Sequence, residues 1–204
     1  MGQEIELKIP LTQEEYDFVF SVIAGNTIIE GLHISEFEKL FKSDEYFSRY
    51  ETMKERNEKV LAGLEPRVIR IRSEKKENGK EESFFTLKWK TVKNGIEMNR
   101  EDETAVENAD VIRSLFSSIG FYKYFEKNKD AYSVYCKYKD FEEELHLELE
   151  KVNQYLYFEV EYTGNSSEPE KIKADLNTFV KLFGLDPQKK DSRSWMSIIL
   201  GKIE

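Results

Sequence analysis

The chain has 204 residues, of which 31 are basic and 40 acidic, so it carries a net charge of −9 at neutral pH. This length suits one domain with a sizeable core, and this charge argues against a general nucleic-acid binder, whose affinity depends on neutralising phosphates. No apolar run approaches the roughly 20 residues of a membrane span, the first residues lack the layout of a signal peptide, and the single cysteine, Cys136, excludes an internal disulfide. We therefore expect a cytoplasmic protein that contacts neither nucleic acid nor membrane.

The first third of the chain mixes predicted strands and helices. It opens with "EIELKIP" (4–10), where charged and aliphatic residues alternate as in a half-buried strand. Thr12 and Glu15 form a capping box for a helix whose apolar stripe runs to Ile23. We then expect a short helix over 35–41, a strand over 43–51 and a helix over 53–64 that ends at Gly63.

From residue 66 onward the pattern changes mainly to a period of two, which is typical of strands. Two such strands, 66–74 and 83–92, flank the hairpin signal Asn78-Gly79, and a second Asn-Gly at 94–95 precedes a strand over 96–106. A helix over 108–120 follows, with Asn108 as its N-cap and Gly120 as its stop. Further strands are expected at 122–139, 142–152 and 155–163, and helices at 168–184 and 192–200.

About eight strands, mostly joined as antiparallel neighbours, point to an α+β fold built on a closed barrel with flanking helices. Eight strands enclose an interior that side chains or one small ligand can fill, and closure removes the exposed strand edges. No repeat or linker is evident, so residues 1–204 are predicted to form a single domain. Within it, 26–66 is expected to be a partly helical insertion that could act as a lid.

Charged residues keep to one side of most strands and largely to one sign within a strand. Examples are Arg70 and Arg72 on one strand and Glu159 and Glu161 on another. The complete set is Glu4, Glu6 and Lys8; Arg70 and Arg72; Lys88 and Lys90; Lys127 and Lys129; Glu144, His146, Glu148 and Glu150; and Glu159 and Glu161. The strand over 96–106 is less clean, because charges lie on both of its sides around Arg100.

Two interpretations of this sorting remain open. A solvated sheet face gives the same alternation without any site. Alternatively, the charges face the barrel interior, where they need water, counter-charges, a metal or a polyanion. Carboxylates from distant strands suit Mg²⁺ or Mn²⁺, and Arg and Lys between them suit phosphate oxygens. Segregation of sign by strand favours the second interpretation.

The order of the motifs resembles the CYTH superfamily, the triphosphate tunnel metalloenzymes, which include class IV adenylate cyclases, thiamine triphosphatases and inorganic triphosphatases. "EIELK" matches the family's ExExK signature. Further segments follow in family order: "DEYF" (44–47), "RIR" (70–72), "LKWK" (87–90), "REDE" (100–103), "EKNKDAY" (126–132), "LELEKV" (147–152), "FEVE" (158–161) and the stretch from 183 onward. The resemblance spans nearly the whole chain and implies an eight-stranded antiparallel tunnel.

The resemblance also implies site residues. Mg²⁺ or Mn²⁺ would be bound by Glu4, Glu6, Glu148, Glu150, Glu159 and Glu161. The triphosphate would be held by Lys8, Arg70, Arg72, Lys88, Lys90, Arg100, Lys127, Lys129 and Arg193. Catalysis is expected from Lys8, Glu6 and Arg72, and a second metal ion could orient the attacking water.

Three positions depart from the family pattern. Lys129 stands where Arg is usual, Glu150 where Asp is usual, and Trp195 where Tyr is usual. The first turns a bidentate phosphate contact into a point contact, and the second moves a carboxylate by about one methylene. Of the two histidines, His33 and His146, only His146 shares the side of the acidic residues, and two imidazoles without a cysteine cluster do not indicate zinc.

The expected function is metal-dependent hydrolysis of a small-molecule triphosphate: inorganic triphosphate, thiamine triphosphate or a nucleoside triphosphate. The alternative is a class IV adenylate cyclase that converts ATP to cyclic AMP and pyrophosphate, because the phosphate-binding residues do not distinguish water from a ribose hydroxyl as nucleophile. The departures at Lys129 and Glu150 leave a third hypothesis, a sensor that binds polyphosphate or a nucleotide without turnover. Either a monomer or a homodimer fits.

Overall fold

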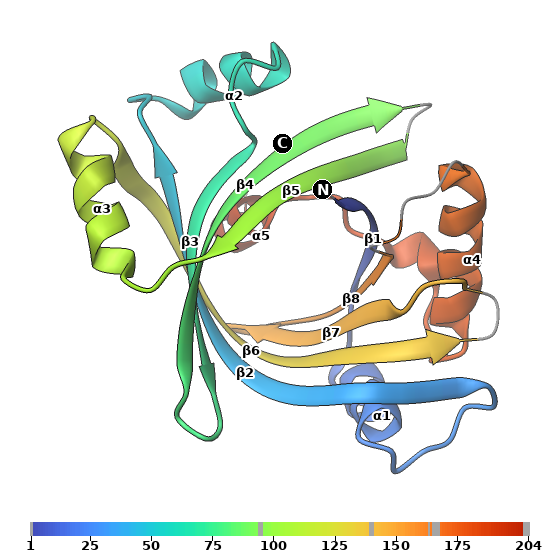
Figure 1. The fold of residues 1–204 in the computed structure, drawn as a ribbon. Coiled ribbons are helices and arrows are strands. Elements are labelled where there is room, and N and C mark those ends of the chain that lie inside the picture. The colour runs from blue at the N-terminus through green and yellow to red at the C-terminus, as the bar shows by residue number, and fades with distance from the viewer. Residues whose placement is uncertain (1, 94–95, 139–140, 163, 165–167, 202–204) are drawn as a thin grey trace.

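The computed structural model describes residues 2–93, 96–138, 141–162, 164 and 168–201, with the side chains of 2–4, 90–93 and 96–99 left out (Figure 1). In this part of the chain, eight strands form one closed antiparallel barrel in the order β1-β5-β4-β3-β2-β6-β7-β8. The strands are β1 (Gly2–Pro10), β2 (Leu32–Ser48), β3 (Val68–Lys76), β4 (Glu81–Lys93), β5 (Ile96–Ala105), β6 (Tyr122–Tyr138), β7 (Leu145–Val152) and β8 (Tyr155–Tyr162). The predicted fold class is confirmed.

Strand β1 closes the barrel by pairing with two partners in succession. Residues 2–4 pair with β5, and residues 5–10 pair with β8. The register places Glu6 opposite Glu161 and Lys8 opposite Glu159. Because side chains alternate along a strand, the charged residues of β1 and β8 project to the same side.

Helices cover the outside of the barrel at two places (Figure 1). The helices are α1 (Gln13–Ile23), α2 (Met53–Leu61), α3 (Ala109–Ser118), α4 (Pro169–Lys181) and α5 (Trp195–Leu200), with a 3₁₀ turn at Pro187–Lys189. The capping box of Thr12 and Glu15 is present at α1, and Asn108 caps α3. None of the described helices combines the length and apolarity that crossing a membrane requires.

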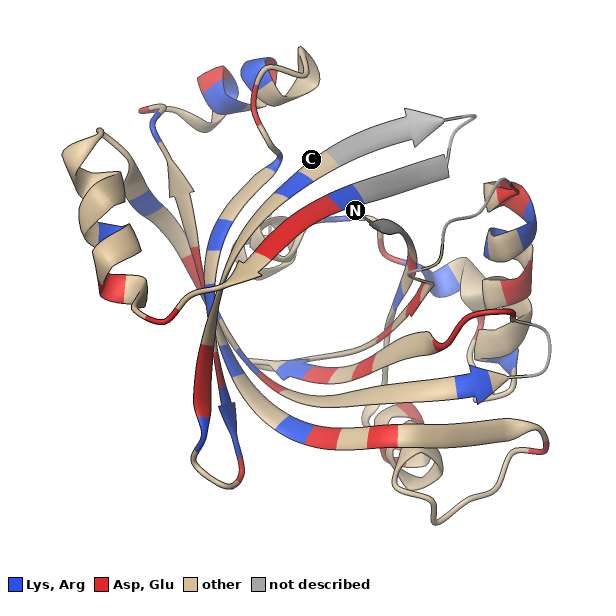
Figure 2. Ribbon diagram, viewed as in Figure 1, with Lys and Arg blue, Asp and Glu red and all other residues tan. Residues whose placement is uncertain are grey.

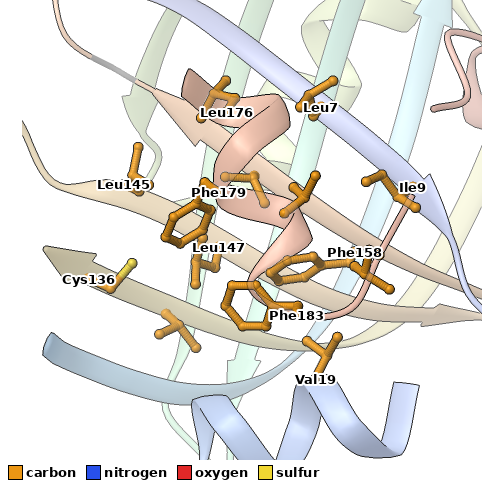
Figure 3. Close-up of a cluster of buried hydrophobic side chains, with 14 of the residues drawn as sticks. Leu7, Ile9, Val19, Cys136, Leu145, Leu147, Phe158, Leu176, Phe179 and Phe183 are labelled. Atoms are coloured by element: carbon orange, nitrogen blue, oxygen red, sulfur yellow. The ribbon is translucent and has the colours of Figure 1, made fainter. Parts of the chain in front are cut away.

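The larger core lies between the outer faces of β1, β6, β7 and β8 and the helices α1 and α4 (Figure 3). Leu7 and Ile9 of β1 and Leu147 of β7 are buried there together with Phe179 of α4. Figure 3 shows the ring of Phe158 next to that of Phe183, with their centroids 5.0 Å apart. The apolar side of these four strands therefore faces outward, beneath helices, and their charged side faces the interior.

A smaller core lies under α3. Phe116 of this helix packs on Phe47 of β2 and Phe85 of β4, with ring centroids 4.9 and 5.7 Å apart. Ile71 of β3 is fully buried in the same cluster. The outward residues of β2, β3 and β4 are therefore covered by α3 in the way that those of β7 and β8 are covered by α4.

The helix predicted over 35–41 is wrong, because these residues belong to the long strand β2. Ile34, Phe37, Leu40 and Phe41 have the spacing of a helical stripe, but in the strand Leu40 is buried while Phe37 and Phe41 are about half exposed. Pairing of β2 with β6 along almost its whole length, and with β3, decides the outcome. Much of the 26–66 stretch is therefore barrel wall, and α2 is its helical part.

Acidic and basic residues recur along the barrel strands as well as on the helices (Figure 2). On β3, for example, Arg70 and Arg72 alternate with Ile69 and Ile71. The burial of both Ile side chains in the outer core fixes the two Arg side chains on the opposite, inner face.

Replacement of Phe179 by alanine tests the outer core. Phe179 is 1% exposed and touches the rings of Phe183 and Tyr138, so Phe179→Ala should lower the free energy of unfolding by about 3–5 kcal/mol. Urea titration followed by circular dichroism measures this change. The matched control is Phe18→Ala, because Phe18 is 42% exposed and should cost less than about 1 kcal/mol. Equal losses in the two variants would contradict the assignment of the core.

Candidate metal and polyphosphate site

Ion pairs that skip a strand show where the charged side chains point. Between strands that are not neighbours, such contacts can form only on the concave side, because side chains on the convex side diverge. Three of these pairs are Lys42 with Glu148 (3.1 Å), Lys88 with Glu6 (3.6 Å) and Arg70 with Glu103 (3.3 Å). Each crosses one intervening strand of the barrel. The charged residues of these pairs therefore lie in the interior and not on an outer solvated face.

Three carboxylates form the acidic centre of this interior. Glu148 and Glu150 of β7 and Glu159 of β8 each offer one oxygen, and these oxygens lie within 4.8 Å of one another. Glu148 stands opposite Glu159 in the register of the two strands. Glu150 is fully buried and Glu148 is nearly so. Oxygen donors at such separations suit a hard divalent cation.

Glu150 is short of positive charge. Burial, followed by the negative charge of Glu159, raises the pKa of Glu150 to about 8. Its Oε1 atom is buried and accepts no hydrogen bond, while its ion pair with Lys129 runs through Oε2 at 2.7 Å. An orphaned carboxylate oxygen beside two further carboxylates is what a cation site needs, so these residues fit Mg²⁺ or Mn²⁺.

Lys127 and Lys129 of β6 form the basic side of the centre. Lys129 is 3% exposed and lies 2.9 Å from Glu148 as well as 2.7 Å from Glu150. Burial, then the adjacent Lys129, lowers the pKa of Lys127, and Asp44 lies 3.3 Å from its ammonium group. Lys129 therefore adjoins the acidic cluster, and Lys127, on the same face of β6, adjoins Asp44.

Asp44 anchors the basic side and was missed as a site residue in the sequence. It is fully buried and accepts two hydrogen bonds from Arg72, at 2.6 and 3.0 Å. Although burial alone would raise the pKa of Asp44, Arg72 and Lys127 hold it well below its usual range. The sequence analysis included Asp44 in the segment "DEYF" but predicted that the strand begins at residue 43. Only the longer strand β2, which begins at Leu32, shows that the Asp44 side chain points inward.

Lys42 was also missed. Two residues before Asp44 on β2, it is 4% exposed and pairs with Glu74 and Glu148, at 3.2 and 3.1 Å. The alternation of Lys42, Asp44 and Tyr46 could have revealed it, if the strand had been predicted to begin before residue 43.

Arg70 and Lys88 extend the basic lining toward β5, where they meet acids. Arg70 lies 3.3 Å from Glu103 and hydrogen-bonds the buried Thr86, while Lys88 lies 2.7 Å from Glu101. Burial alone would raise the pKa of Glu101, but the positive charges of Lys88 and Arg70 outweigh burial, so the pKa of Glu101 is lowered. Glu101 and Glu103 are inward residues that the mixed pattern of 96–106 concealed.

The short helix α5 covers one end of the barrel. Trp195 packs on the inward-facing Val152 and Tyr157, and the ammonium of Lys8 lies 5.4 Å from its ring. Lys8 also donates a hydrogen bond to the backbone carbonyl of Arg193 at 2.5 Å. The Arg193 side chain is about half exposed and pairs with Asp191 at 2.7 Å. Lys8 and Arg193 are thus neighbours at this end.

Glu6 and Glu161 lie together beyond the carboxylate cluster. Glu161 accepts a contact from His146 Nδ1 at 3.1 Å, and the other ring nitrogen lies 2.9 Å from Ser133. The positive charge of Lys88 lowers the pKa of Glu6, but burial and the negative charges of Glu159 and Glu161 raise it by more, so the pKa of Glu6 is raised. Its side chain is 41% exposed, so Glu6 remains accessible to solvent and ligands.

The prediction that Arg100 faces the interior is wrong. Gln3 and Trp89 stand opposite it in the registers of β5 with β1 and β4, which places Arg100 on the outer face. Its guanidinium pairs with Asp102 at 2.6 Å and covers the ring of Trp89. The side chains of Glu4 and Lys90 lie outside the part of the chain that the structure describes.

The anchor formed by Asp44 gives a stability prediction. Asp44→Asn removes the charge that Arg72 and Lys127 share in a buried place, so it should cost about 3–5 kcal/mol of unfolding free energy at neutral pH. Chemical denaturation measures the loss. Asp102→Asn is the control, because its pair with Arg100 is solvent-exposed and should contribute less than about 1 kcal/mol. A comparable loss in both variants would show that the interior network does not stabilise the barrel.

No family model and no curated protein matches this chain. Solved structures do match it. The PH1819 protein of Pyrococcus horikoshii is 18% identical with a TM-score of 0.71, over 97% of this chain and 98% of the other. A "putative adenylate cyclase" of Vibrio parahaemolyticus is 16% identical with a TM-score of 0.66, over 98% and 99%. A protein of the same description from Bacillus halodurans is 16% identical with a TM-score of 0.53, over 98% of both chains.

At these identities the likeness concerns the fold, and it covers nearly the full length of each chain. The antiparallel eight-stranded barrel agrees with the tunnel that the ExExK resemblance implied. The chain therefore shares its fold with these solved structures.

Proposed function

We propose that the barrel interior binds a small-molecule triphosphate together with a divalent cation and hydrolyses the triphosphate. The observation that carries this proposal is the juxtaposition of a carboxylate cluster with a basic lining. Lys129 lies within 2.9 Å of both Glu148 and Glu150, and Lys127, Arg72 and Arg70 continue away from it across β6, β2 and β3. A metal–polyphosphate complex presents the same two kinds of charge side by side.

The cation would be held by Glu150 and Glu159, with Glu148 beside them. When bound, Mg²⁺ or Mn²⁺ would neutralise charge on the phosphate oxygens as a Lewis acid. The fit rests on the orphaned Glu150 oxygen and on the separation of the three donor atoms, within 4.8 Å.

The phosphates would be held by Arg70, Arg72, Lys88 and Lys127. Arg72 directs its Nε and Nη2 atoms at Asp44, so this carboxylate orients the guanidinium. The Nη1 atom, which lies 3.8 Å from Glu74, is the donor that a phosphate would meet. Burial and a neighbouring ammonium disfavour the charged form of Lys127, and an incoming anion would relieve that cost. Bases fixed in advance stabilise charge that develops in the transition state without rearranging.

Hydrolysis also requires a group that accepts a proton from the attacking water. Glu6 suits this task, because it is accessible and its pKa is raised by lost hydration and by Glu159 and Glu161, against the influence of Lys88. Lys8 donates a hydrogen bond to the backbone carbonyl of Arg193. This contact holds the Lys8 ammonium group in place, where its charge could bind phosphate.

A substrate panel tests the proposal. With Mg²⁺ or Mn²⁺ present, phosphate should be released from at least one of tripolyphosphate, thiamine triphosphate and ATP. Glu150→Gln should lower kcat/KM by about 100-fold or more, because it removes a charge from the cation site without changing its shape. Arg100→Gln is the control and should change the rate less than about twofold, because Arg100 faces outward. Binding of these compounds without turnover would instead indicate a sensor.

Adenylate cyclase activity is the second candidate, favoured by the description that the Vibrio and Bacillus proteins carry. The same interior would then hold ATP, and the ribose 3′-hydroxyl would replace water as the nucleophile. Incubation with ATP and Mn²⁺, followed by chromatography, separates the two reactions. Hydrolysis predicts ADP and phosphate, whereas cyclic AMP with pyrophosphate would identify a cyclase and contradict the leading proposal.

A further inference from the structure

Lys42 carries a buried positive charge at the edge of the carboxylate cluster. It lies on β2, and its side chain is 5% exposed between Glu74 of β3 and Glu148 of β7. To reach Glu148 it crosses β6, where Lys129 is its partner in the register. The two ammonium groups therefore stand next to each other, and both contact Glu148 Oε1, at 3.1 and 2.9 Å.

Positive charge is distributed unequally among the three carboxylates. Two ammonium groups lie within ion-pair distance of Glu148 Oε1, although their angles are not those of hydrogen bonds; at such separations charge attraction decides the energy. Among the described basic side chains, Lys129 alone lies within ion-pair distance of Glu150, through Oε2, and Oε1 of Glu150 is buried and has no donor from a basic side chain. The cluster is compensated at Glu148 and open at Glu150.

From this we propose that Lys42 takes the place of a second divalent cation beside Glu148, so that the interior binds one divalent cation, at Glu150 and Glu159. An ion placed at Glu148 would meet two ammonium groups at close range and would be repelled. Lys42 cannot easily move aside, because it is buried and is also held by Glu74 at 3.2 Å. The inference rests on the proposed metal-dependent function, and it states how many divalent cations the barrel interior binds.

Counting bound Mn²⁺ without any phosphate tests this inference separately from activity. Isothermal titration calorimetry and the electron paramagnetic resonance signal of free Mn²⁺ both give the number of ions per chain. The wild-type protein should bind one ion. Lys42→Gln, which removes the blocking charge and leaves Glu148 in place, should bind two.

Two further variants serve as controls. Lys39→Gln lies on the same strand and also breaks an ion pair, with Glu77 at 3.2 Å, but its side chain is 45% exposed, so one ion should still bind. The double variant Lys42→Gln/Glu148→Gln removes the blocking charge together with the ligand it blocks, and should return to one ion. Removing both members of a buried pair also disturbs folding less than removing one, so two ions bound to this variant would contradict the role of Lys42 even if Lys42→Gln does not fold.

The outcomes separate the inference from the proposed function. Two ions bound to the wild-type protein, or one ion bound to folded Lys42→Gln, would overturn the role of Lys42 and leave metal-dependent hydrolysis standing. Two ions in the double variant would also overturn it, because the second ion would not depend on Glu148. Absence of Mn²⁺ binding to the wild type would overturn both proposals.

Discussion

The constraint on which this structure depends is that ionised side chains inside a barrel must be compensated there. A charge removed from water costs several kcal/mol unless partners surround it. The interior meets this requirement by chains of alternating sign: Arg72 and Lys127 share Asp44, while Lys42 and Lys129 share Glu148. Compensation is least complete at Glu150, and the proposed function begins from that imbalance.

Much of the fold follows from local pattern, because most strands are charged on one side and apolar on the other. Alternation predicted β6 and β8 to within one residue and β3 to within two, and caps at Thr12 and Asn108 marked helix starts. The first part of β2 could not be predicted from alternation. Ile34, Phe37 and Leu40 have a helical spacing, and only pairing with β6, distant in sequence, makes them a strand.

A site residue could be predicted from the sequence only where the pattern of its strand showed that its side chain points into the barrel. Glu148, Glu150 and Glu159 are brought together by the register of β7 and β8, as their shared parity suggested. The prediction for Arg100 was wrong because this residue lies one position away from the inward-facing positions of β5. A shift of one residue along a strand turns a side chain to the other face. Which acid neutralises which base depends on contacts across strands, and no spacing in the sequence encodes those.

Anomalous diffraction from crystals soaked with Mn²⁺ and a non-hydrolysable triphosphate would locate both ligands in the protein. We expect a manganese peak bounded by Glu150 and Glu159, with phosphates alongside Lys127 and Arg72 in the barrel. Manganese and triphosphate located on the outer surface, with the interior ion pairs undisturbed, would contradict this expectation.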